Sequence, residues 1–249
     1  MCLGAIDGKH IAIQQPKNSG SEFFNYKGYF SILLLAIASH EYKFLYVDVG
    51  ASGRNGDAGV FDNSELKKMM DEGSMGFPEP EELGETGLSC NYHIIGDDAF
   101  PLRKDVMKPF PFRQLHYERH IYNYRLSRAR RVVENAFGIM ANRFRVFLTK
   151  IELEPEKAKM ITLAACCLHN MLIEKQGSYT SNGIDHENEN HDMIPGTWRM
   201  DPQLATMETT HNRNFSFSSK GQRNLLKTFF NSRVGSVPWQ DSMVSLNKQ

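Results

Sequence analysis

Residues 4–13 read GAIDGKHIAI, an apolar run that is interrupted by one carboxylate, that of Asp7. A run of this length and composition is typical of a β-strand inside a sheet. A carboxylate in the middle of such a strand costs roughly several kcal/mol when it is desolvated and unpaired. Asp7 therefore needs a metal ion, a cation or several hydrogen bonds. The alternative is an aspartate at a strand end that caps Gly8 in a turn.

Three further stretches have the character of strands. Residues 32–37 read ILLLAI and predict a fully buried strand, and residues 44–49 return from it as the second arm of an antiparallel hairpin. Residues 92–96 predict a fourth strand, reached by a helical crossover and therefore parallel to an earlier strand. The sequence thus predicts an α/β fold with a mixed sheet, antiparallel in its first three strands and parallel in the fourth, flanked by helices.

Apolar positions three or four residues apart predict two long helices. From 122 to 147 the spacing has no miss, which makes this the clearest helix of the chain. The helix from 155 to 173 is apolar nearly all round, so we expect it to be buried. A shorter helix follows residue 63, with Asn63 or Ser64 as its N-cap.

Composition divides the 249 residues into a domain over residues 1–175, a polar linker over 176–220 and a short helical segment over 221–249. Residues 176–220 are rich in Asn, His and Ser and bury too little apolar surface to order themselves. Residues 71–87 are acidic, contain two prolines and lack periodicity, so we expect a mobile surface loop.

The charges of the chain are unevenly distributed along the sequence. Lys+Arg and Asp+Glu are both 29, so the total gives no hint of a nucleic-acid partner, but residues 119–145 hold seven arginines and one acid. Cys166 and Cys167 lie in an apolar helical run and are expected to be buried small hydrophobes. The start of the chain has no signal-peptide pattern, which favours a reducing compartment, and no stretch is long and apolar enough to cross a bilayer.

Two further acidic residues, Asp97 and Glu134, lie at positions where ligand-binding side chains are often found. Asp97 follows the strand at 92–96, and open α/β sheets place their ligands at the carboxyl ends of strands. The alternative is a loop residue or an N-cap before Pro101. Glu134 follows the buried stripe of its helix by one residue, about 100° round, so it borders the packed face. An ordinary surface ion pair with Arg130 or Arg131 is its alternative.

Three converging carboxylates would suit a two-metal phosphodiesterase. Two divalent ions about 4 Å apart activate water and stabilise the phosphate and the leaving oxygen, and Mg²⁺ or Mn²⁺ prefers carboxylate oxygens. Asp7 would bridge the ions, with Asp97 and Glu134 each holding one and Asp57 as a reserve ligand. Four arginines of the long helix would contact DNA phosphates, or else form a solvated face: Arg125, Arg128, Arg130 and Arg131.

Six short segments, in order along the chain, carry a family resemblance. They read IDGKH (6–10), GRNGDA (53–58), GDDAFP (96–101), NYRLSRAR (123–130), ENAFG (134–138) and LHN (168–170). On them the chain resembles the PIF/Harbinger-type DDE transposases and the Harbinger transposase-derived nucleases. Lys9 is a departure, because a small residue is usual after Asp-Gly. The chain also starts at the first strand, without the helical region that precedes it in full-length relatives.

The resemblance implies a ribonuclease H-like fold with Asp7, Asp97 and Glu134 as the metal-binding triad. It further implies a nuclear DNA endonuclease, with a cytoplasmic pool left open, and a Myb-like DNA-binding protein that supplies targeting. We therefore expect a divalent-metal-dependent DNA endonuclease. A domesticated, non-catalytic DNA or chromatin adaptor with the same fold is the alternative, and a third is an interaction domain whose acids are all structural.

Overall fold

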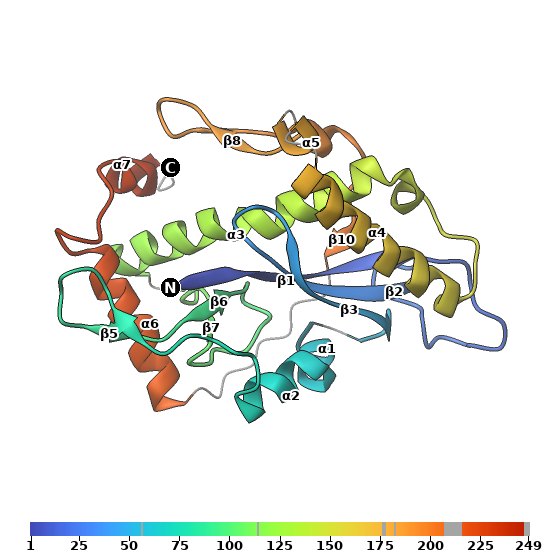
Figure 1. Ribbon diagram of the computed structural model, residues 1–249, viewed down its shortest axis with the longest axis horizontal. Coiled ribbons are helices and arrows are strands. Elements are labelled where there is room, and N and C mark those ends of the chain that lie inside the picture. Colours follow the sequence, from blue (N-terminus) through green and yellow to red (C-terminus); the bar gives the residue numbers. More distant parts are fainter. Residues whose placement is uncertain (56, 114, 176–177, 182, 207–215, 247–249) are drawn as a thin grey trace.

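The computed structural model describes residues 1–55, 57–113, 115–175, 178–181, 183–206 and 216–246, and shows a sheet with helices on both faces (Figure 1). The strands are β1 (Cys2–Ala12), β2 (Ser31–Ala38), β3 (Phe44–Ser52), β4 (Glu81–Glu82), β5 (Ser89–Cys90), β6 (His93–Ile95), β7 (Val106–Met107), β8 (His186–Glu187), β9 (Met193–Ile194) and β10 (Ala205–Thr206). The helices are α1 (Asp57–Asn63), α2 (Glu65–Glu72), α3 (Tyr117–Arg143), α4 (Pro155–Lys175), α5 (Ser178–Ser181), α6 (Phe217–Phe230) and α7 (Gln240–Leu246), with 3-10 helices η1 (Arg145–Leu148) and η2 (Thr197–Met200).

The main sheet has the order β3-β2-β1-β6-β7. β1 pairs with β2 and β2 with β3 in antiparallel fashion, whereas β6 is parallel to β1 and β7 to β6. Three antiparallel strands followed by parallel ones are consistent with a ribonuclease H-like fold. This confirms the predicted mixed sheet, including the antiparallel hairpin and the parallel fourth strand.

The sheet separates two apolar cores, because successive strand residues point to opposite faces. Ala5 and Ile11 of β1 pack on the face that α3 and α4 cover, while Ile6 packs on the other face with α1 and α2. Asp7 and Lys9 share the parity of Ala5 and Ile11. The two charged side chains therefore lie on the α3 face of the central strand.

The helices differ from expectation at α4. Only one side of α4 is buried, through residues such as Ala165 and Cys166, whereas Met160 is 67% exposed and Leu168 is 43% exposed. Cys167 is also exposed. The predictions that α4 is buried all round and that Cys167 is buried were wrong. The reason is that α4 packs chiefly on β3, the outermost strand, and its outer side has no layer above it. Ser64 caps α2, as predicted.

The predicted linker is partly folded onto the domain. Trp198 is buried, Asp185 is buried and bound by Arg199, and β10 pairs with the carboxyl half of β1. The expectation that this polar segment does not order itself was wrong for residues 183–206. The indole of Trp198 and the ion pair between Asp185 and Arg199 anchor the segment, and an average over its composition does not reveal them. Helix α6 also begins at Phe217, within the predicted linker. Residues 207–215 lie outside the described part of the chain, and the domain boundaries stay predictions.

Two smaller findings complete the fold. The acidic stretch contains the two-residue strand β4, which pairs with β5, so the prediction that it lacks strands was wrong at that point. Leu83 is buried there and supplies the anchor. None of the described helices combines the length and apolar character that a bilayer crossing requires.

Gly138 of α3 tests the packing of the C-terminal segment. A Cβ atom at this position would come within 2.2 Å of the Trp198 indole. We expect Gly138→Ala to lower the free energy of unfolding by about 2 kcal/mol, because overpacking of a tight contact typically costs 1–3 kcal/mol. Denaturant unfolding followed by tryptophan fluorescence measures it. Gly221→Ala in α6, where nothing lies within 4 Å, is the control and should not destabilise. Equal stability of the two variants would contradict the packing of Trp198.

His169 predicts a pH dependence of stability. Its Nε2–H donates to Tyr42 O and its Nδ1 accepts from Tyr179 Oη, both at 2.9 Å, so the buried ring is neutral. Burial lowers the pKa of His169 from 6.5 to about 4. The unfolded chain binds the proton more readily, so this contribution is complete above pH 6.5 and is lost as the pH falls toward 4.

The measurement compares urea unfolding at pH 7 and pH 5 in wild type and His169→Gln. From pH 7 to pH 5 we expect wild type to lose about 2 kcal/mol more stability than the variant. An identical loss in both proteins would show that His169 is not the titrating group.

Candidate active site

Strand register brings the two candidate aspartates together. Ala5 of β1 lies opposite Ile95 of β6 in the parallel ladder. Two residues further along come Asp7, within β1, and Asp97, just past the end of β6. Asp97 also faces α3, because its Oδ2 lies 4.0 Å from a nitrogen of Arg130 on that helix. Neighbouring strands are about 4.8 Å apart, so the two carboxylates leave adjacent backbone positions.

Asp7 also lies where the edge of β1 changes partner. Cys2 to Ala5 pair with β6, whereas Lys9 and His10 pair with β10. The two partner strands leave Asp7 at the fork between them. A fork of this kind opens the sheet for a ligand, as at the switch points of other α/β sheets.

The carboxylate of Asp7 is almost completely buried, at 2% exposure. Its Oδ2 is 2.9 Å from Lys9 Nζ, and its Oδ1 accepts from the Gly8 N–H at 2.9 Å. The Lys9 ammonium also lies 5.7 Å from the centroid of the Phe137 ring on α3. The Lys9 cation and the Gly8 N–H both compensate the charge of Asp7. Asp7 and Gly8 lie inside β1, so the alternative of a strand-end aspartate in a turn was wrong, and the expected need for a cation or hydrogen bonds is met.

Asp97 is held more loosely. Its Oδ1 accepts from the Ala99 N–H at 2.9 Å, and its Oδ2 is 4.0 Å from an Arg130 nitrogen. Burial raises the pKa of Asp97, Arg130 opposes the rise, and the negative charge of Asp7 adds to it. The repulsion from Asp7 places the two carboxylates within electrostatic range of each other.

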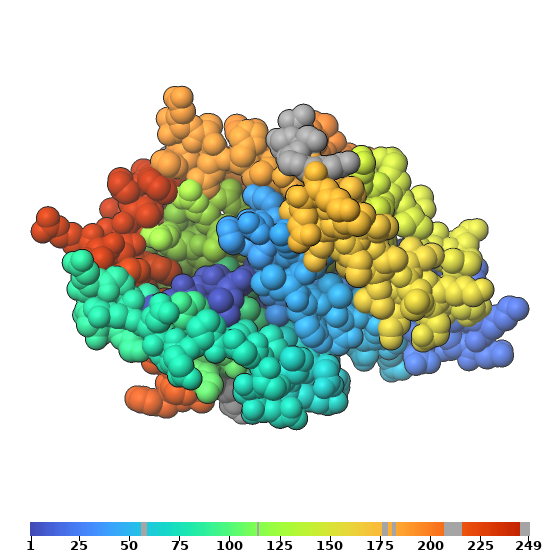
Figure 2. Space-filling view, viewed as in Figure 1, coloured from blue at the N-terminus to red at the C-terminus, as the bar shows by residue number. Residues whose placement is uncertain are grey.

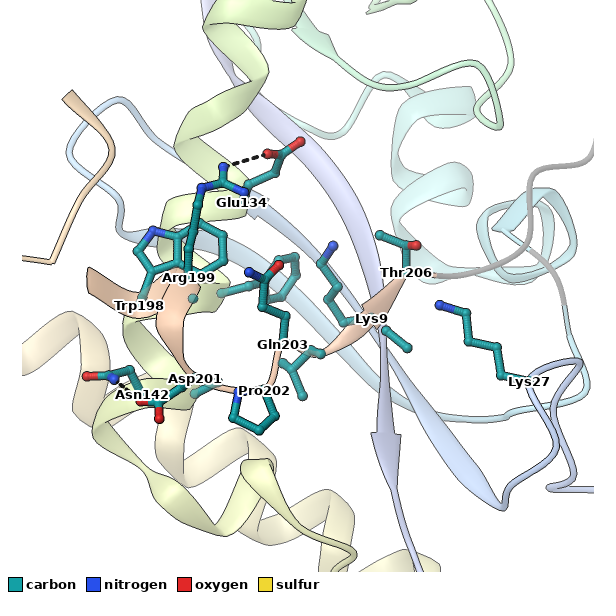
Figure 3. A pocket seen from close by; sticks show the side chains of 15 residues that line it. Lys9, Lys27, Glu134, Asn142, Trp198, Arg199, Asp201, Pro202, Gln203 and Thr206 are labelled. Carbon is teal, nitrogen blue, oxygen red and sulfur yellow. Dashed lines mark hydrogen bonds and ion pairs between the residues drawn. The ribbon is translucent and has the colours of Figure 1, made fainter. Parts of the chain in front are cut away.

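Glu134 takes a different partner from the expected one. It leaves α3 toward η2, where its Oε2 is 3.5 Å from an Arg199 nitrogen, and its side chain is 34% exposed (Figure 3). It borders a cavity of about 450 Å³ that Lys9 lines from β1. Asp97 borders another cavity, of about 660 Å³. The strand order thus places Asp7 on β1 and Asp97 just past the end of the adjacent strand β6, whereas Glu134 shares a cavity with Lys9, the ion-pair partner of Asp7.

The predicted triad stays a prediction as a ligand set. Within the ranges that the structure describes, no three His, Cys, Asp or Glu side chains lie close enough together to hold one metal ion. Asp57, the reserve ligand, begins helix α1, but its side chain lies outside the described residues.

The donor chemistry nevertheless fits a divalent cation. Asp7, Asp97 and Glu134 offer hard carboxylate oxygens of the type that Mg²⁺ and Mn²⁺ prefer. Burial is the main cause of the raised pKa of Asp97, and the charge of Asp7 adds to it; a bound cation would oppose both effects. Lys9, Arg130 and Arg199 supply part of that charge from the protein itself.

The four predicted DNA-binding arginines all have protein partners. Arg125 donates to Gly235 O and Gln240 Oε1 and lies 4.7 Å from the centroid of the Phe230 ring. Arg128 and Arg131 both bind Glu187. Arg130 faces Asp97. The expectation of a simple solvated face does not describe them, and their contact with DNA stays a prediction.

Sequence reasoning missed Arg199 and Glu187, which pair with the candidate residues from the predicted linker. The available signal was Trp198, a large apolar residue in a polar stretch, which marks a segment that packs. Nothing local to Glu187 distinguishes it from its acidic neighbours Glu189 and Asp192.

The fold and these residues agree with the comparisons. The profile of the DDE superfamily endonuclease family matches residues 6–170, a span that runs from β1 through α4 and includes all three candidate acids. The chain belongs to this family. No solved structure matches it significantly.

Two named relatives come from distant organisms. Over 175 residues the chain is 27% identical to the Homo sapiens protein named "Putative nuclease HARBI1", covering 69% of this chain and 46% of that protein. Over 179 residues it is 27% identical to the Arabidopsis thaliana "Protein ALP1-like", covering 70% and 44%. The chain thus spans less than half the length of these curated relatives. The match confirms the resemblance to Harbinger transposase-derived nucleases.

The pair of Lys9 and Asp7 tests the charge balance of the site. Both residues are buried, so we expect Lys9→Met to lower the free energy of unfolding by about 3 kcal/mol, because it leaves the Asp7 charge without its cation. The double variant Lys9→Met/Asp7→Asn should be less destabilised than the sum of its two single variants.

Lys68→Met is the matched control, since Lys68 pairs with Glu65 where both side chains are 65% exposed. Surface pairs typically contribute about 0–1 kcal/mol. Urea denaturation of the variants measures the difference, and equal effects of the two lysine substitutions would contradict a buried, charge-compensating role for Lys9.

Proposed function

We propose that this chain is a divalent-metal-dependent DNA endonuclease that hydrolyses phosphodiester bonds, with Asp7, Asp97 and Glu134 as its catalytic carboxylates. The observation that carries the proposal is the adjacent placement of Asp7 and Asp97 on the α3 face, at a fork in the sheet of a DDE superfamily endonuclease. The names of the relatives support the same reaction class.

The residues divide the chemistry among them. Asp7, Asp97 and Glu134 would hold Mg²⁺ or Mn²⁺, which supplies an activated water and stabilises negative charge on the phosphate. Arg130 lies 4.0 Å from Asp97 and can bind a phosphate oxygen beside that carboxylate. Lys9 pairs with the buried carboxylate of Asp7 at 2.9 Å.

The proposal extends to the setting of the reaction. A nuclear location, DNA as the substrate and a Myb-like DNA-binding protein as the source of targeting follow from the family resemblance. The cavity of about 450 Å³ that Glu134 borders is also lined by Lys9, Lys27 and Arg199. Their positive charge suits a polyanionic substrate.

A second function has one observation in its favour. Each of the three acids has a cationic neighbour from the protein itself, in Lys9, Arg130 and Arg199. A site whose acids are already neutralised has less need of a metal. That arrangement suits a non-catalytic DNA or chromatin adaptor, which would bind DNA through the same fold without cutting it.

Plasmid nicking separates the two functions. Purified protein is incubated with supercoiled plasmid and Mg²⁺ or Mn²⁺, and the conversion to open circles is followed on gels. We expect metal-dependent nicking that EDTA abolishes and that Asp97→Asn lowers by about 100-fold or more, since even outer partners of metal ligands typically contribute about 10- to 100-fold.

Asp62→Asn is the matched control, because Asp62 is exposed on α1 and its substitution changes the net charge equally. Full nicking by this control, with loss in Asp97→Asn, supports the endonuclease. Metal-independent DNA binding without nicking in wild type would establish the adaptor instead.

A further inference from the structure

A short hairpin places one carboxylate on two arginines of α3. The strands β8 and β9 pair through His186 with Ile194 and Glu187 with Met193. Glu187 Oε2 binds Arg128 and Glu187 Oε1 binds Arg131, so each carboxylate oxygen has its own guanidinium. Figure 1 shows this hairpin over α3, and Figure 2 shows it at the upper edge of the molecule above the green surface of that helix.

This arrangement reproduces the way in which arginines bind a phosphodiester. Guanidinium groups bind two-oxygen anions through charge-assisted hydrogen bonds, and a carboxylate and the two non-bridging oxygens of a phosphate present similar pairs of acceptors. Arg128 and Arg131 are three residues apart and therefore share one face of the helix. A backbone phosphate at the position of Glu187 would satisfy both guanidiniums equally well.

The pair of arginines lies in the same groove as Asp97, one of the candidate catalytic acids. Asp97, Arg130, Arg128, Arg131 and Glu187 all line the cavity of about 660 Å³. A DNA strand whose scissile phosphate reached Asp97 and Arg130 would continue along the same cavity, which Arg128 and Arg131 also line. Glu187 occupies that continuation.

The hairpin buries little apolar surface beyond its base, where Asp185 pairs with Arg199. Its ladder has two residue pairs, and Met193 and Ile194 of β9 are 46% and 39% exposed. Its tip is attached through His191, whose ring stacks on Trp239 at 3.7 Å between centroids and whose Nδ1 is 3.6 Å from Glu187 Oε2. A segment with little buried apolar surface opens at a low free-energy cost.

We propose that Glu187 is an internal phosphate mimic, which covers Arg128 and Arg131 until DNA displaces it. The contact is autoinhibitory, because it withholds two phosphate-binding groups from the groove that leads to Asp97. The inference rests on the proposed function in one respect, that the ligand is DNA, and it does not depend on cleavage.

The test measures DNA affinity in EDTA, so that cleavage does not contribute. Fluorescence anisotropy of a labelled duplex is recorded for wild type and Glu187→Gln at several salt concentrations. We expect Glu187→Gln to bind about tenfold more tightly and to steepen the slope of log K against log salt by about 0.9, the contribution of the one phosphate that both guanidiniums bind.

Glu189→Gln is the matched control. Glu189 is exposed near the tip of the same hairpin, so its substitution removes the same charge without uncovering the arginines. It should change the affinity by about twofold or less and leave the salt slope unaltered. The gain in Glu187→Gln should also vanish in the variant that carries Arg128→Ala and Arg131→Ala in addition, and thermal melting verifies that each variant is folded.

The outcomes separate this inference from the function on which it rests. Equal affinity and equal slope for Glu187→Gln and Glu189→Gln would overturn the phosphate mimic while leaving DNA binding intact. Persistence of the gain without the two arginines would also overturn it. Absence of DNA binding in every variant would overturn both the mimic and the proposed nucleic-acid substrate.

Discussion

The centre of the molecule depends on how the buried carboxylate of Asp7 is neutralised. It lies in the central strand, beneath α3, where water does not reach it. Strand alternation provides the solution, because Lys9, two residues later, points to the same face and pairs with it at 2.9 Å. A pair of buried charges is seldom a net source of stability compared with apolar residues. Its presence in the core of β1 therefore directs attention to chemistry rather than to packing.

Other acidic residues near α3 are also paired with cationic side chains of the protein. Asp97 pairs with Arg130, Glu134 pairs with Arg199, and Glu187 pairs with Arg128 and Arg131. A chain with no net charge thus pairs opposite charges along the two cavities that α3 lines. Under the proposed function, an incoming phosphodiester would compete with the acids for these cations and would release carboxylates as it binds. In that case the binding of substrate phosphate to the cations would free the catalytic carboxylates in the same step.

The placement of Asp7, Lys9 and Asp97 could be predicted from the local sequence. Alternation in GAIDGKHIAI places Asp7 and Lys9 together, and the strand at 92–96 places Asp97 at the matching end, because these relations depend on periods of two and on parallel pairing. The orientation of Glu134 could not be read, since a residue 100° from the buried stripe can turn to either side and its partner is 65 positions away, at Arg199. The average polarity of residues 183–206 concealed their packing. The segment is anchored by the single side chain of Trp198, which packs against Gly138, although most of its other residues are polar.

The pairing of β10 with β1 has a consequence for the solubility of fragments. Lys9 and His10 would present a free row of backbone donors and acceptors if Ala205 and Thr206 were absent. Such an open border on an apolar strand is a template for strand addition from another molecule, and natural sheets normally cover it. A fragment trimmed to the family-matched span would expose this border. The residues beyond α4 therefore act as a guard against aggregation, in addition to any part that they play in catalysis.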